Sequence, residues 1–365
     1  MYVAHQYWKS TDRCFTIRVS VIDLSWTVTG EPTSKSEWRT LFDSQPCIKP
    51  AEPFDDSETG GRLAWADGSL LVTVGDHGFA GLNGDTPHSQ NDDVDYGKIL
   101  KIDPVSGAYS IFSRGHRNAQ GLTVARDGRI WSSEHGPQGG DELNLIVEGE
   151  NYGWPYVTYG TSYGSNAWPL NPDGQNHGSY KEPAFAFVPS IATSALIEIS
   201  GNQFPRWDGD LLLSSLRTRA LFRIRHKEGR VIYVEPIGLG ERVRDLTQSP
   251  DGRIVVWSDA GVIIELSRST MGSAFNRFCK GCHAPDFGAA AGPTLNNIVG
   301  RNIASVSGFA YSPSLLNQRG KWTEASLNAF LTDPESFAPG TTMKLIGLDE
   351  ASREAVIAYL MENSK

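Results

Sequence analysis

Two cysteines and a histidine close together near residue 280 are the side chains of this sequence best suited to chemistry. They stand in the order Cys279-Lys280-Gly281-Cys282-His283. Two thiols at this spacing can form thioethers with the vinyl groups of a haem, and the adjacent imidazole can then coordinate the iron. A redox dithiol and half of a zinc site also contain Cys-x-x-Cys, but neither requires a histidine directly after it. The stretch predicts covalent attachment of a c-type haem.

A methionine downstream offers a second ligand to the iron. Met343 ends the string Pro339-Gly340-Thr341-Thr342-Met343, and a thioether opposite a histidine raises the reduction potential of a haem. Other strings between and after these residues are Gly292-Pro293-Thr294-Leu295, Gly300-Arg301, Tyr311-Ser312, Trp322 and a helical run at 352–362. In this order the set resembles a class I cytochrome c over roughly residues 271–365. The resemblance implies a small all-α domain with His283 and Met343 as iron ligands.

Length and composition bound the other possibilities. A chain of 365 residues exceeds the usual size of one domain, so two domains are expected. Its 39% hydrophobic and 21% charged residues are typical of a globular protein. We find no apolar run long enough to span a bilayer. The net charge of −9 argues against nucleic acid as a partner.

Two further cysteines, Cys14 and Cys47, bear on the cellular compartment. Covalent haem attachment usually takes place in an exporting compartment, where a disulfide is also stable. Because both cysteines lie in one strand-rich segment, we expect them to form a disulfide. The start of the sequence, 1–6, lacks the basic and apolar regions of a signal peptide. We therefore expect a periplasmic or otherwise exported protein whose N-terminal part is missing from this sequence.

The first 268 residues alternate short apolar runs with turns and show scarcely any helical periodicity. Asp-Gly pairs, which favour tight hairpins with positive φ, recur between the apolar runs. Sheet units repeated in this way along a chain are typical of a β-propeller. The pairs are Asp67-Gly68, Asp127-Gly128, Asp208-Gly209 and Asp251-Gly252, and answering strands are expected at 97–102, 142–146, 220–225 and 261–266.

Four such units occupy residues 62–268, and strand-like segments precede them at 1–50. A six-bladed propeller needs more chain than this, so we expect a propeller of the six-bladed type that lacks its first blade. Small polar residues at 267–275 would form a linker. The prediction is an all-β propeller domain at 1–268 followed by an all-α cytochrome domain at 269–365.

Several ordered strings in the predicted propeller are specific enough to indicate a family. They are Gly97–Leu100, Gly115–Leu122, Glu134–Ile146, Asn151–Pro155 and Arg242–Asp245. Over roughly residues 55–268 the chain resembles the soluble quinoproteins, which comprise PQQ-dependent glucose dehydrogenase and the aldose sugar dehydrogenases. The resemblance implies PQQ as cofactor and a small sugar as substrate.

The resemblance also implies which residues would bind PQQ, a planar orthoquinone with three carboxylates. Arginine suits such a group because its planar fork binds a carboxylate through two hydrogen bonds. By motif, Arg117 and Asn118 would face the cofactor, and Arg242 and Arg244 would bind its carboxylates. Arg217 stands where the family commonly has a lysine. Any one of these arginines could be a solvated side chain at a blade edge, so the prediction depends on the set.

Calcium is implied by the same resemblance. Gly136-Pro137 resembles the position where backbone carbonyls hold Ca²⁺ against the quinone. Calcium prefers such oxygen ligands, and as a Lewis acid it would polarise the quinone carbonyl that receives hydride. Asp141 and Glu142 could bind a second, structural calcium, or could be a turn carboxylate and a solvated strand charge.

The catalytic base is where the chain departs from the family. Family members carry a histidine just before a Gly-Gly-Arg-Leu string, which is Gly60-Gly61-Arg62-Leu63 here, and Glu58 occupies the histidine position. A buried glutamate with a raised pKa can serve as a general base, so Glu58 and Arg117 are the predicted catalytic residues. Two alternatives stay open, namely that the base is lost and that His77 replaces it.

The sequence thus predicts a PQQ-dependent aldose dehydrogenase fused to a cytochrome c. Electrons would pass from C1 of a sugar through Ca²⁺-bound PQQ to the haem, and onward to an external acceptor such as another cytochrome or a quinone pool. A tethered haem has a high effective concentration beside the quinone. Two other hypotheses remain, a degenerate propeller beside a working cytochrome and a calcium-dependent propeller hydrolase such as a lactonase.

Overall fold

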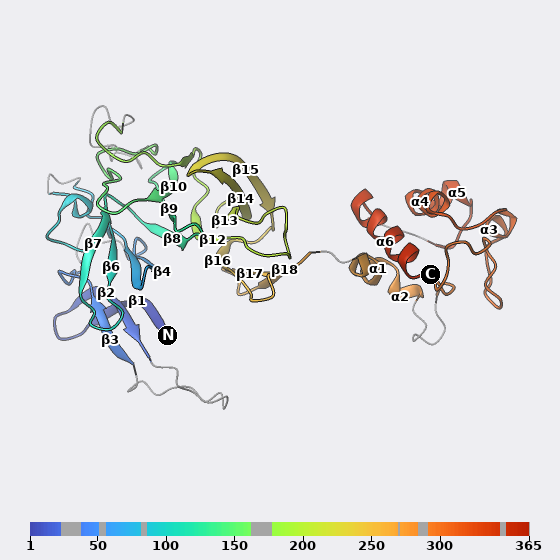
Figure 1. Ribbon diagram of the computed structural model, residues 1–365, viewed down its shortest axis with the longest axis horizontal. Helices are drawn as coiled ribbons and strands as arrows, with labels where there is room; N and C mark the ends of the chain where they lie inside the picture. The colour runs from blue at the N-terminus through green and yellow to red at the C-terminus, as the bar shows by residue number, and fades with distance from the viewer. Residues whose placement is uncertain are drawn as a thin grey trace. The chain divides into compact units, whose positions relative to one another are not determined.

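The computed structural model of the protein describes residues 1–22, 38–50, 56–81, 86–161, 177–268, 271–283, 291–343 and 348–364. The chain divides into two compact units, Met1–Ser267 and Arg268–Lys365. The described part of the first unit is built almost entirely from strands, and that of the second from helices (Figure 1). Within these ranges, no helix combines the length and the apolar character that crossing a membrane requires.

The described part of the first unit forms five antiparallel sheets, arranged as the blades of a β-propeller (Figure 1). In Figure 1 the colour of the sheets runs from blue at the N-terminal sheet to gold at the last sheet. The first strands of the later sheets, β4, β8, β12 and β16, contact one another in that order. The sheets are β1 (Tyr2–Lys9), β2 (Cys14–Val21) and β3 (Arg39–Asp43); β4 (Gly60–Ala66), β5 (Ser69–Val74), β6 (Lys98–Ile102) and β7 (Tyr109–Arg114); β8 (Ala119–Val124), β9 (Ile130–Glu134), β10 (Asp141–Ile146) and β11 (Phe185–Phe187); β12 (Thr193–Glu198), β13 (Leu211–Ser215), β14 (Ala220–Lys227) and β15 (Arg230–Gly238); and β16 (Val243–Gln248), β17 (Ile254–Ser258) and β18 (Ile263–Leu266).

The predicted hairpins are confirmed. Each Asp-Gly pair lies between the first and second strands of one of the four later sheets. Asp67 and Gly68 both have positive φ, 46° and 78°, as a type I′ turn requires. The glycines of the other three pairs have φ values of 84°, 82° and 87°, at Gly128, Gly209 and Gly252.

Neighbouring sheets pack through shared apolar clusters, which is how strands with two apolar faces become buried. Leu122 of β8 lies in one cluster with Leu71 and Ile99 of the preceding sheet. Leu213 of β13 shares another with Leu143 of β10. Since each fully buried side chain of this kind stabilises the fold by about 1.5–3 kcal/mol, stacking of the sheets provides much of the stability.

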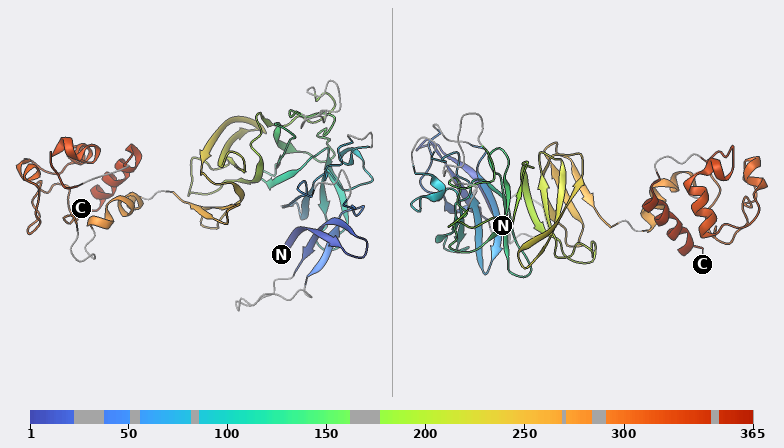
Figure 2. Two further views of the ribbon diagram at one scale, coloured as in Figure 1. Left: turned by 180° about the vertical axis from the view of Figure 1, so that it is seen from behind. Right: turned by 90° about the horizontal axis from the view of Figure 1, so that it is seen from above.

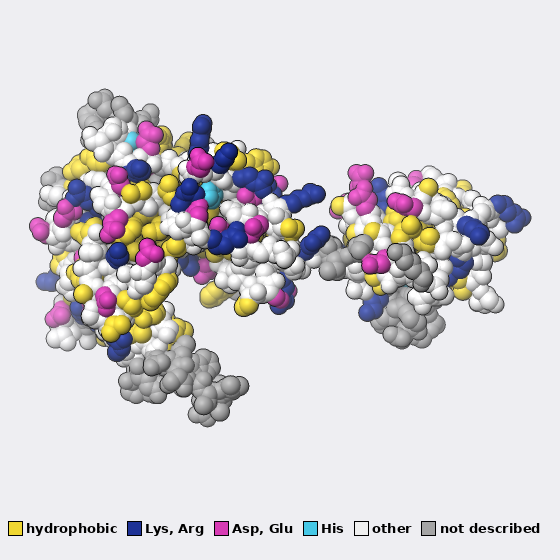
Figure 3. Space-filling view, in the orientation of Figure 1, with side chains coloured by type: hydrophobic (Ala, Val, Ile, Leu, Met, Phe, Trp, Pro, Cys, Tyr) yellow, Lys and Arg dark blue, Asp and Glu magenta, His cyan; other side chains and the backbone are white. Residues whose placement is uncertain are grey.

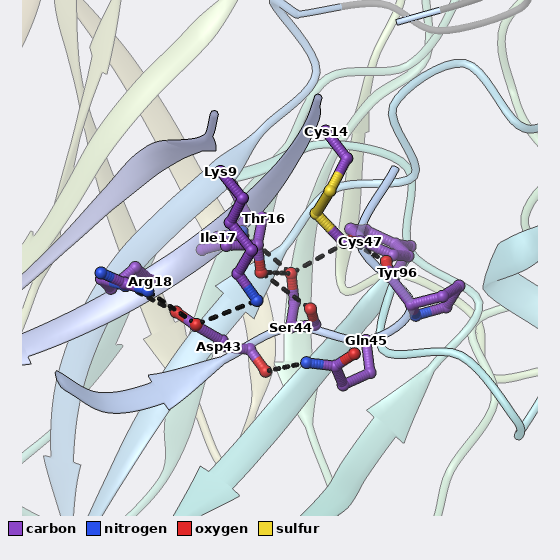
Figure 4. The surroundings of a disulfide bond; sticks show 11 residues. Lys9, Cys14, Thr16, Ile17, Arg18, Asp43, Ser44, Gln45, Cys47 and Tyr96 are labelled. Atoms are coloured by element: carbon purple, nitrogen blue, oxygen red, sulfur yellow. Dashed lines mark hydrogen bonds and ion pairs between the residues drawn. A yellow bond between two sulfur atoms is a disulfide. The ribbon is translucent and has the colours of Figure 1, made fainter. Parts of the chain in front are cut away.

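The first sheet is tied together by a disulfide, as predicted. Cys14 and Cys47 are bonded, and their Cα atoms are 5.6 Å apart (Figure 4). Beside them, the Ser44 hydroxyl accepts a hydrogen bond from the Ile17 N–H at 2.9 Å and donates one to the Tyr96 hydroxyl at 3.1 Å. The segment after β3 is therefore fastened both to β2 and to the second sheet.

The second unit packs short helices around an apolar core (Figure 2). Its last helix covers the run predicted at 352–362, and it contacts the first and fourth helices. Asp349 caps its start, accepting a hydrogen bond from the Ser352 N–H at 2.7 Å. The helices are α1 (Met271–Phe278), α2 (Lys280–His283), α3 (Pro313–Asn317), α4 (Glu324–Thr332), α5 (Pro334–Phe337) and α6 (Glu350–Glu362).

Candidate functional sites

A cavity of about 330 Å³ in the second unit is lined by all four predicted haem residues, Cys279, Cys282, His283 and Met343. Helix geometry explains how the first three meet. The N–H groups of Cys282 and His283 both donate to the Cys279 carbonyl, at 3.1 and 3.0 Å, so one turn presents both thiols and the imidazole to the same space. Apolar side chains such as Leu327 and Phe330 line the rest of the cavity, as a macrocycle excluded from water requires.

The imidazole of His283 is held in one orientation. Its Nδ1 lies 2.7 Å from the Pro293 carbonyl oxygen, so the neutral ring donates from Nδ1 and keeps Nε2 available to a metal. Burial lowers the pKa of His283, which favours this neutral form. A Cβ added to Gly292 would come within 2.3 Å of the His283 ring. The glycine is therefore required for the ring to take this position.

The two thiols lack the character of a redox dithiol. Cys279 and Cys282 are not bonded to each other. Burial raises the pKa of the Cys279 thiol to about 11, whereas reactive dithiols have a lowered thiol pKa. The two cysteines therefore fit covalent attachment of a haem better than they fit a redox dithiol.

In the propeller, four successive sheets share one backbone hydrogen bond at the same end. In each sheet the donor is a backbone N–H that lies one to three residues after the end of the second strand. The acceptor is the carbonyl of a residue one or two positions before the start of the first strand of the same sheet. Since Glu58, Asn118 and Arg242 accept in three of these bonds and Arg217 donates in one, the predicted site residues lie at one end of the propeller. The bonds run from His77 to Glu58 (3.3 Å), His135 to Asn118 (3.1 Å), Arg217 to Ile191 (3.1 Å) and Asp259 to Arg242 (2.9 Å).

Arg62 joins three of these sheets near their first strands. Its Nε donates to the Gln120 carbonyl of β8 at 3.0 Å, and its Nη1 lies 3.1 Å from the Asp245 carboxylate of β16. Because Arg62 itself belongs to β4, this one side chain draws the second, third and fifth sheets together. It acts as a positioning residue of the Gly-Gly-Arg-Leu string.

Arg117 and Glu58 meet at this end of the propeller, as an ion pair whose side chains are each only 11% exposed. The guanidinium of Arg117 also donates to the Gly136 carbonyl at 3.1 Å, and it lies over the Trp154 ring at 5.4 Å. Its Nε–H is buried and, among the described residues, has no hydrogen-bond partner. An unsatisfied N–H on a buried cation fits an anionic oxygen of a ligand.

Asn118 has a different role from the one that its motif implies. Its Oδ1 accepts from the Gly60 N–H at 3.2 Å and from the Gln120 side chain at 2.7 Å. The side-chain oxygen is thus used within the protein, where it holds the loop that carries Glu58. This contact makes Asn118 a positioning residue, and its predicted contact with the cofactor stays a prediction.

The other predicted arginines lie at the same end of the fourth and fifth sheets. Arg242 and Arg244 each donate from Nε to the Asp259 carboxylate, at 3.0 and 2.7 Å. Both hydrogen bonds lower the pKa of Asp259, and the bond from Arg244 has the larger effect. Arg242 also reaches the Leu216 carbonyl at 3.4 Å, next to the exposed Arg217. Arg242 and Arg244 thus share one carboxylate, and with Arg217 they provide three arginines at this end of two adjacent sheets, which fits a ligand with several carboxylates.

Asp141 has an observed role that needs no calcium. One oxygen accepts from the Gly136 N–H at 3.1 Å and the Ser190 hydroxyl at 2.5 Å, and the other from the N–H groups of Ile191 (2.9 Å) and Ala192 (2.6 Å). The carboxylate therefore joins the loop of the third sheet to that of the fourth. These hydrogen bonds use the carboxylate within the protein, and the second, structural calcium stays a prediction.

The structure shows few contacts for the other residues that were predicted to bind calcium, which are Gly136, Pro137 and Glu142. The Gly136 carbonyl accepts from Arg117, and Pro137 follows it in a buried position. Burial raises the pKa of Glu142 well above its usual range, and the Asn144 amide donates to it at 3.2 Å. Over the described ranges, no three His, Cys, Asp or Glu side chains gather as a metal-ligand group. Both calcium assignments stay predictions.

The predicted alternative base, His77, is buried against an aromatic ring. Its side chain is 2% exposed, and its ring packs edge-on against Tyr96 with centroids 5.5 Å apart. Glu58 is the candidate base that contacts the central arginine. The neighbouring Asp76, fully buried, accepts a hydrogen bond from the Trp154 indole N–H at 2.6 Å, and its backbone N–H donates to the Arg117 carbonyl at 2.9 Å. Sequence reasoning missed both Asp76 and Trp154, although Trp154 lies inside the string Asn151–Pro155 and Asp76 directly precedes His77.

Acidic and basic side chains are interspersed on the face of the first unit drawn in Figure 3, without a broad basic patch. The absence of nucleic acid as a partner stays a prediction from the net charge of the sequence.

These two sites belong to a propeller and a helical haem-binding unit, and comparisons with known proteins identify both. Residues 1–265 match the family described as Glucose / Sorbosone dehydrogenase, and residues 272–364 match Cytochrome c. The chain belongs to the Glucose / Sorbosone dehydrogenase family and carries a cytochrome c domain after the propeller.

Individual proteins show the same division. The chain is 29% identical over 255 residues to the aldose sugar dehydrogenase YliI of Escherichia coli, covering 64% of each protein. It is 47% identical over 87 residues to a cytochrome cy of Rhodobacter capsulatus, covering 24% of this chain and 44% of that one. A crystal structure of a glucose dehydrogenase matches with a TM-score of 0.61 at 26% identity, covering 74% of this chain and 78% of that one. The chain thus spans less than two thirds of either curated relative.

Proposed function

We propose that this protein is a PQQ-dependent aldose dehydrogenase that passes electrons from a sugar to its own covalently bound haem, and then to an external acceptor. The observation that carries the proposal is the pairing of Arg117 with Glu58 at the propeller end where Arg217, Arg242 and Arg244 also lie. Several arginines at one end of a propeller, in one chain with a haem cavity, support a redox reaction on an anionic quinone.

Four arginines would bind and orient the cofactor. Arg117 offers its unpartnered Nε–H, and Arg217, Arg242 and Arg244 offer guanidinium groups to the carboxylates. PQQ, when bound, supplies the quinone that accepts a hydride. Calcium at the carbonyls of Gly136 and Pro137 would strengthen that acceptor as a Lewis acid.

Glu58 would take the proton of the sugar hydroxyl at C1. Arg117 beside it favours the ionised carboxylate, which is the form that can accept a proton. Burial of the pair excludes water, so the proton of the sugar goes to Glu58 rather than to solvent. This role distinguishes the proposal from a degenerate propeller in which Glu58 is only a loop charge.

The second unit would then carry single electrons. Cys279 and Cys282 would hold the haem covalently, and His283 with Met343 would be its axial ligands. The His283 orientation set by Pro293 supports that assignment. The disulfide and the covalent haem both support a periplasmic or otherwise exported location, where another cytochrome or a quinone pool would be the final acceptor.

The test is a haem-reduction assay on the full chain, matured with haem and supplied with PQQ and Ca²⁺. We expect aldose-dependent reduction of the haem spectrum only when PQQ is present. Reduction by dithionite but by none of the aldoses would contradict the proposal and favour a degenerate propeller. Ester hydrolysis that needs Ca²⁺ but not PQQ would favour a lactonase-like enzyme instead.

A variant links the assay to the site. Arg117→Ala removes charge-assisted hydrogen bonds worth about 1.5–3 kcal/mol, so we expect roughly ten- to hundredfold weaker PQQ binding. The matched control is Arg126→Ala, because Arg126 is exposed and lies in the β8–β9 turn, at the opposite end of the same sheet. PQQ affinity is measured by equilibrium titration. Equal losses in both variants would argue against a specific role for Arg117.

A further inference from the structure

We propose that Ser89 is a positioning residue for the Arg117–Trp154 pair, and that its buried hydroxyl thereby sets the affinity of the site for an anionic ligand. The residue itself would touch neither substrate nor cofactor. The functional part of this inference rests on the proposed binding of PQQ at Arg117. The placement of the Trp154 ring is a property of the protein without any cofactor, so it can be tested separately.

Trp154 is held at each of its polar groups. Its carbonyl oxygen accepts hydrogen bonds from the Ser89 hydroxyl at 2.7 Å and from the Gln90 side-chain amide at 2.6 Å. Its backbone N–H donates to the Gly115 carbonyl at 3.1 Å, and its indole N–H donates to Asp76 at 2.6 Å. Since a carbonyl oxygen has two lone pairs, the two donors satisfy it fully. The backbone and the ring of Trp154 are therefore both fixed.

Ser89 also holds the chain that leads into Arg117. It lies in the short 3₁₀ helix His88–Gln90, between β5 and β6, and it is fully buried. Its carbonyl accepts a hydrogen bond from the N–H of Gly115, two residues before Arg117, at 3.0 Å. The Arg117 guanidinium lies over the Trp154 ring at 5.4 Å. Ser89 therefore fixes both segments that carry this pair of side chains, one through its carbonyl and the other through its hydroxyl.

The surroundings of Ser89 leave little room for movement. A Cβ added to Gly97 would come within 2.4 Å of the Ser89 Cβ. A Cβ added to Gly115 would come within 2.2 Å of the Asn151 side-chain oxygen. The Asn151 amide donates to the Gln90 side chain at 2.8 Å and so orients the second donor to the same carbonyl. Gly97, Gly115 and Asn151 each begin one of the ordered strings of the sequence, and these strings converge on a serine that none of them contains.

The position of the Trp154 ring matters because it limits where the Arg117 guanidinium can lie. That group also pairs with Glu58 and donates to the Gly136 carbonyl at 3.1 Å. Its Nε–H is buried and has no hydrogen-bond partner in the described part of the chain. A displacement of the ring would change the direction in which this N–H points. Since hydrogen bonds weaken steeply with poor alignment, the affinity for a carboxylate at Nε depends on the ring.

Equilibrium titration of the full chain with PQQ, after maturation with haem, tests whether Ser89 acts through Arg117. We expect Ser89→Ala to weaken PQQ binding about three- to tenfold, the effect of one lost neutral hydrogen bond. In an Arg117→Ala background the same change should alter the affinity by less than about twofold, because the group that it positions is gone. A merely structural role would give equal losses in both backgrounds, and that result would overturn the proposal. An unchanged affinity in Ser89→Ala alone would also overturn it.

The matched control is Ser132→Ala. Ser132 is as buried as Ser89, and its hydroxyl donates to the Gly121 carbonyl at 3.0 Å, so the same kind of bond is lost at a different carbonyl. PQQ affinity should stay unchanged in this variant, and a loss as large as that in Ser89→Ala would overturn the proposal. If Ser89→Ala does not fold, Gln90→Leu removes the other donor to the Trp154 carbonyl and should show the same dependence on the arginine.

Nuclear magnetic resonance of the indole N–H groups tests the placement of the ring without PQQ. The sequence contains ten tryptophans, so protein labelled with ¹⁵N at the indole nitrogens gives ten signals, and Trp154→Phe identifies the one from Trp154. We expect this signal to shift in Ser89→Ala and to stay in place in Ser132→Ala. An unchanged signal in Ser89→Ala would overturn the proposal. If wild type binds no PQQ, the proposed function fails, whereas the indole signal still decides whether Ser89 positions Trp154.

Discussion

The haem site and the propeller site are assembled in different ways. Three of the predicted haem residues lie within Cys279–His283, where one helical turn brings them together, and Met343 completes the cavity. In the propeller, Glu58 precedes the second sheet, Arg117 precedes the third, and Arg242 precedes the fifth. Glu58 and Arg117 meet, and Arg242 lies at the same end, only because successive sheets pack against one another.

This difference has a mechanical consequence. A site built from one helical turn depends mainly on local hydrogen bonds, whereas a site built from several sheets depends on the packing between them. Changes in the packing of the first unit should therefore reach the quinone site and spare the haem. Changes beside His283 should have the reverse effect. Three predictions test this separation, from the largest expected effect to the smallest.

Removal of the disulfide should weaken the propeller alone. The bond between Cys14 and Cys47 spans 33 residues. Closing a loop of this length stabilises a fold by roughly 3–4 kcal/mol through restriction of the unfolded chain. The double variant Cys14→Ala/Cys47→Ala is unfolded in urea, with tryptophan fluorescence and haem absorption followed together. Only the fluorescence midpoint should fall. Equal shifts of both midpoints would show that the two units unfold as one.

An added methyl group at Gly75 should disturb the base. Its Cβ would lie 1.9 Å from the Glu58 carbonyl oxygen, so the backbone must move, at a cost of about 1–3 kcal/mol. We expect Gly75→Ala to lower the rate of aldose-dependent haem reduction while reduction by dithionite stays normal. Gly238→Ala is the control, because a Cβ there meets no heavy atom within 4 Å. Normal turnover in Gly75→Ala would argue against Glu58 as the base.

The corresponding change beside the haem should have a smaller and more local effect. A Cβ on Gly292 would lie 2.3 Å from the His283 ring, which can shift at a cost of about 1 kcal/mol. Gly292→Ala should change the haem absorption spectrum and leave PQQ affinity unchanged. Gly281→Ala, within the same motif and without a neighbour inside 4 Å, should change neither. An unchanged spectrum in Gly292→Ala would contradict the orientation proposed for His283.

Much of the fold could be predicted from short-range patterns. The Asp-Gly turns mark the hairpins because Asp67 and Gly68 adopt positive φ, which few other residues do cheaply. The pairing of Cys14 with Cys47 was also predicted and is confirmed. The types of the residues involved are nearly enough to predict each of these features without knowledge of the fold.

The contacts that shape the propeller site were harder to predict. Asp141 binds the N–H groups of Ile191 and Ala192, some fifty residues away, and no local pattern reveals such partners. Asp259, which pairs with Arg242 and Arg244, was missed for the same reason. A carboxylate in a turn has the same sequence signature whether it anchors a loop, binds a metal or faces water.

By itself the sequence determined the strand-turn-strand character of the first unit, and it predicts Cys279 and Cys282 as haem attachment residues with His283 as a ligand, because these follow from neighbouring residues and local backbone preferences. Only the tertiary structure decided which charges meet away from water. Glu58 and Arg117 are 59 residues apart in the chain, and Asp76 and Trp154 are 78 apart, yet each pair is in contact in the folded protein. The free energy of such a cluster depends on which groups share one desolvated space, and that is a property of the packed sheets.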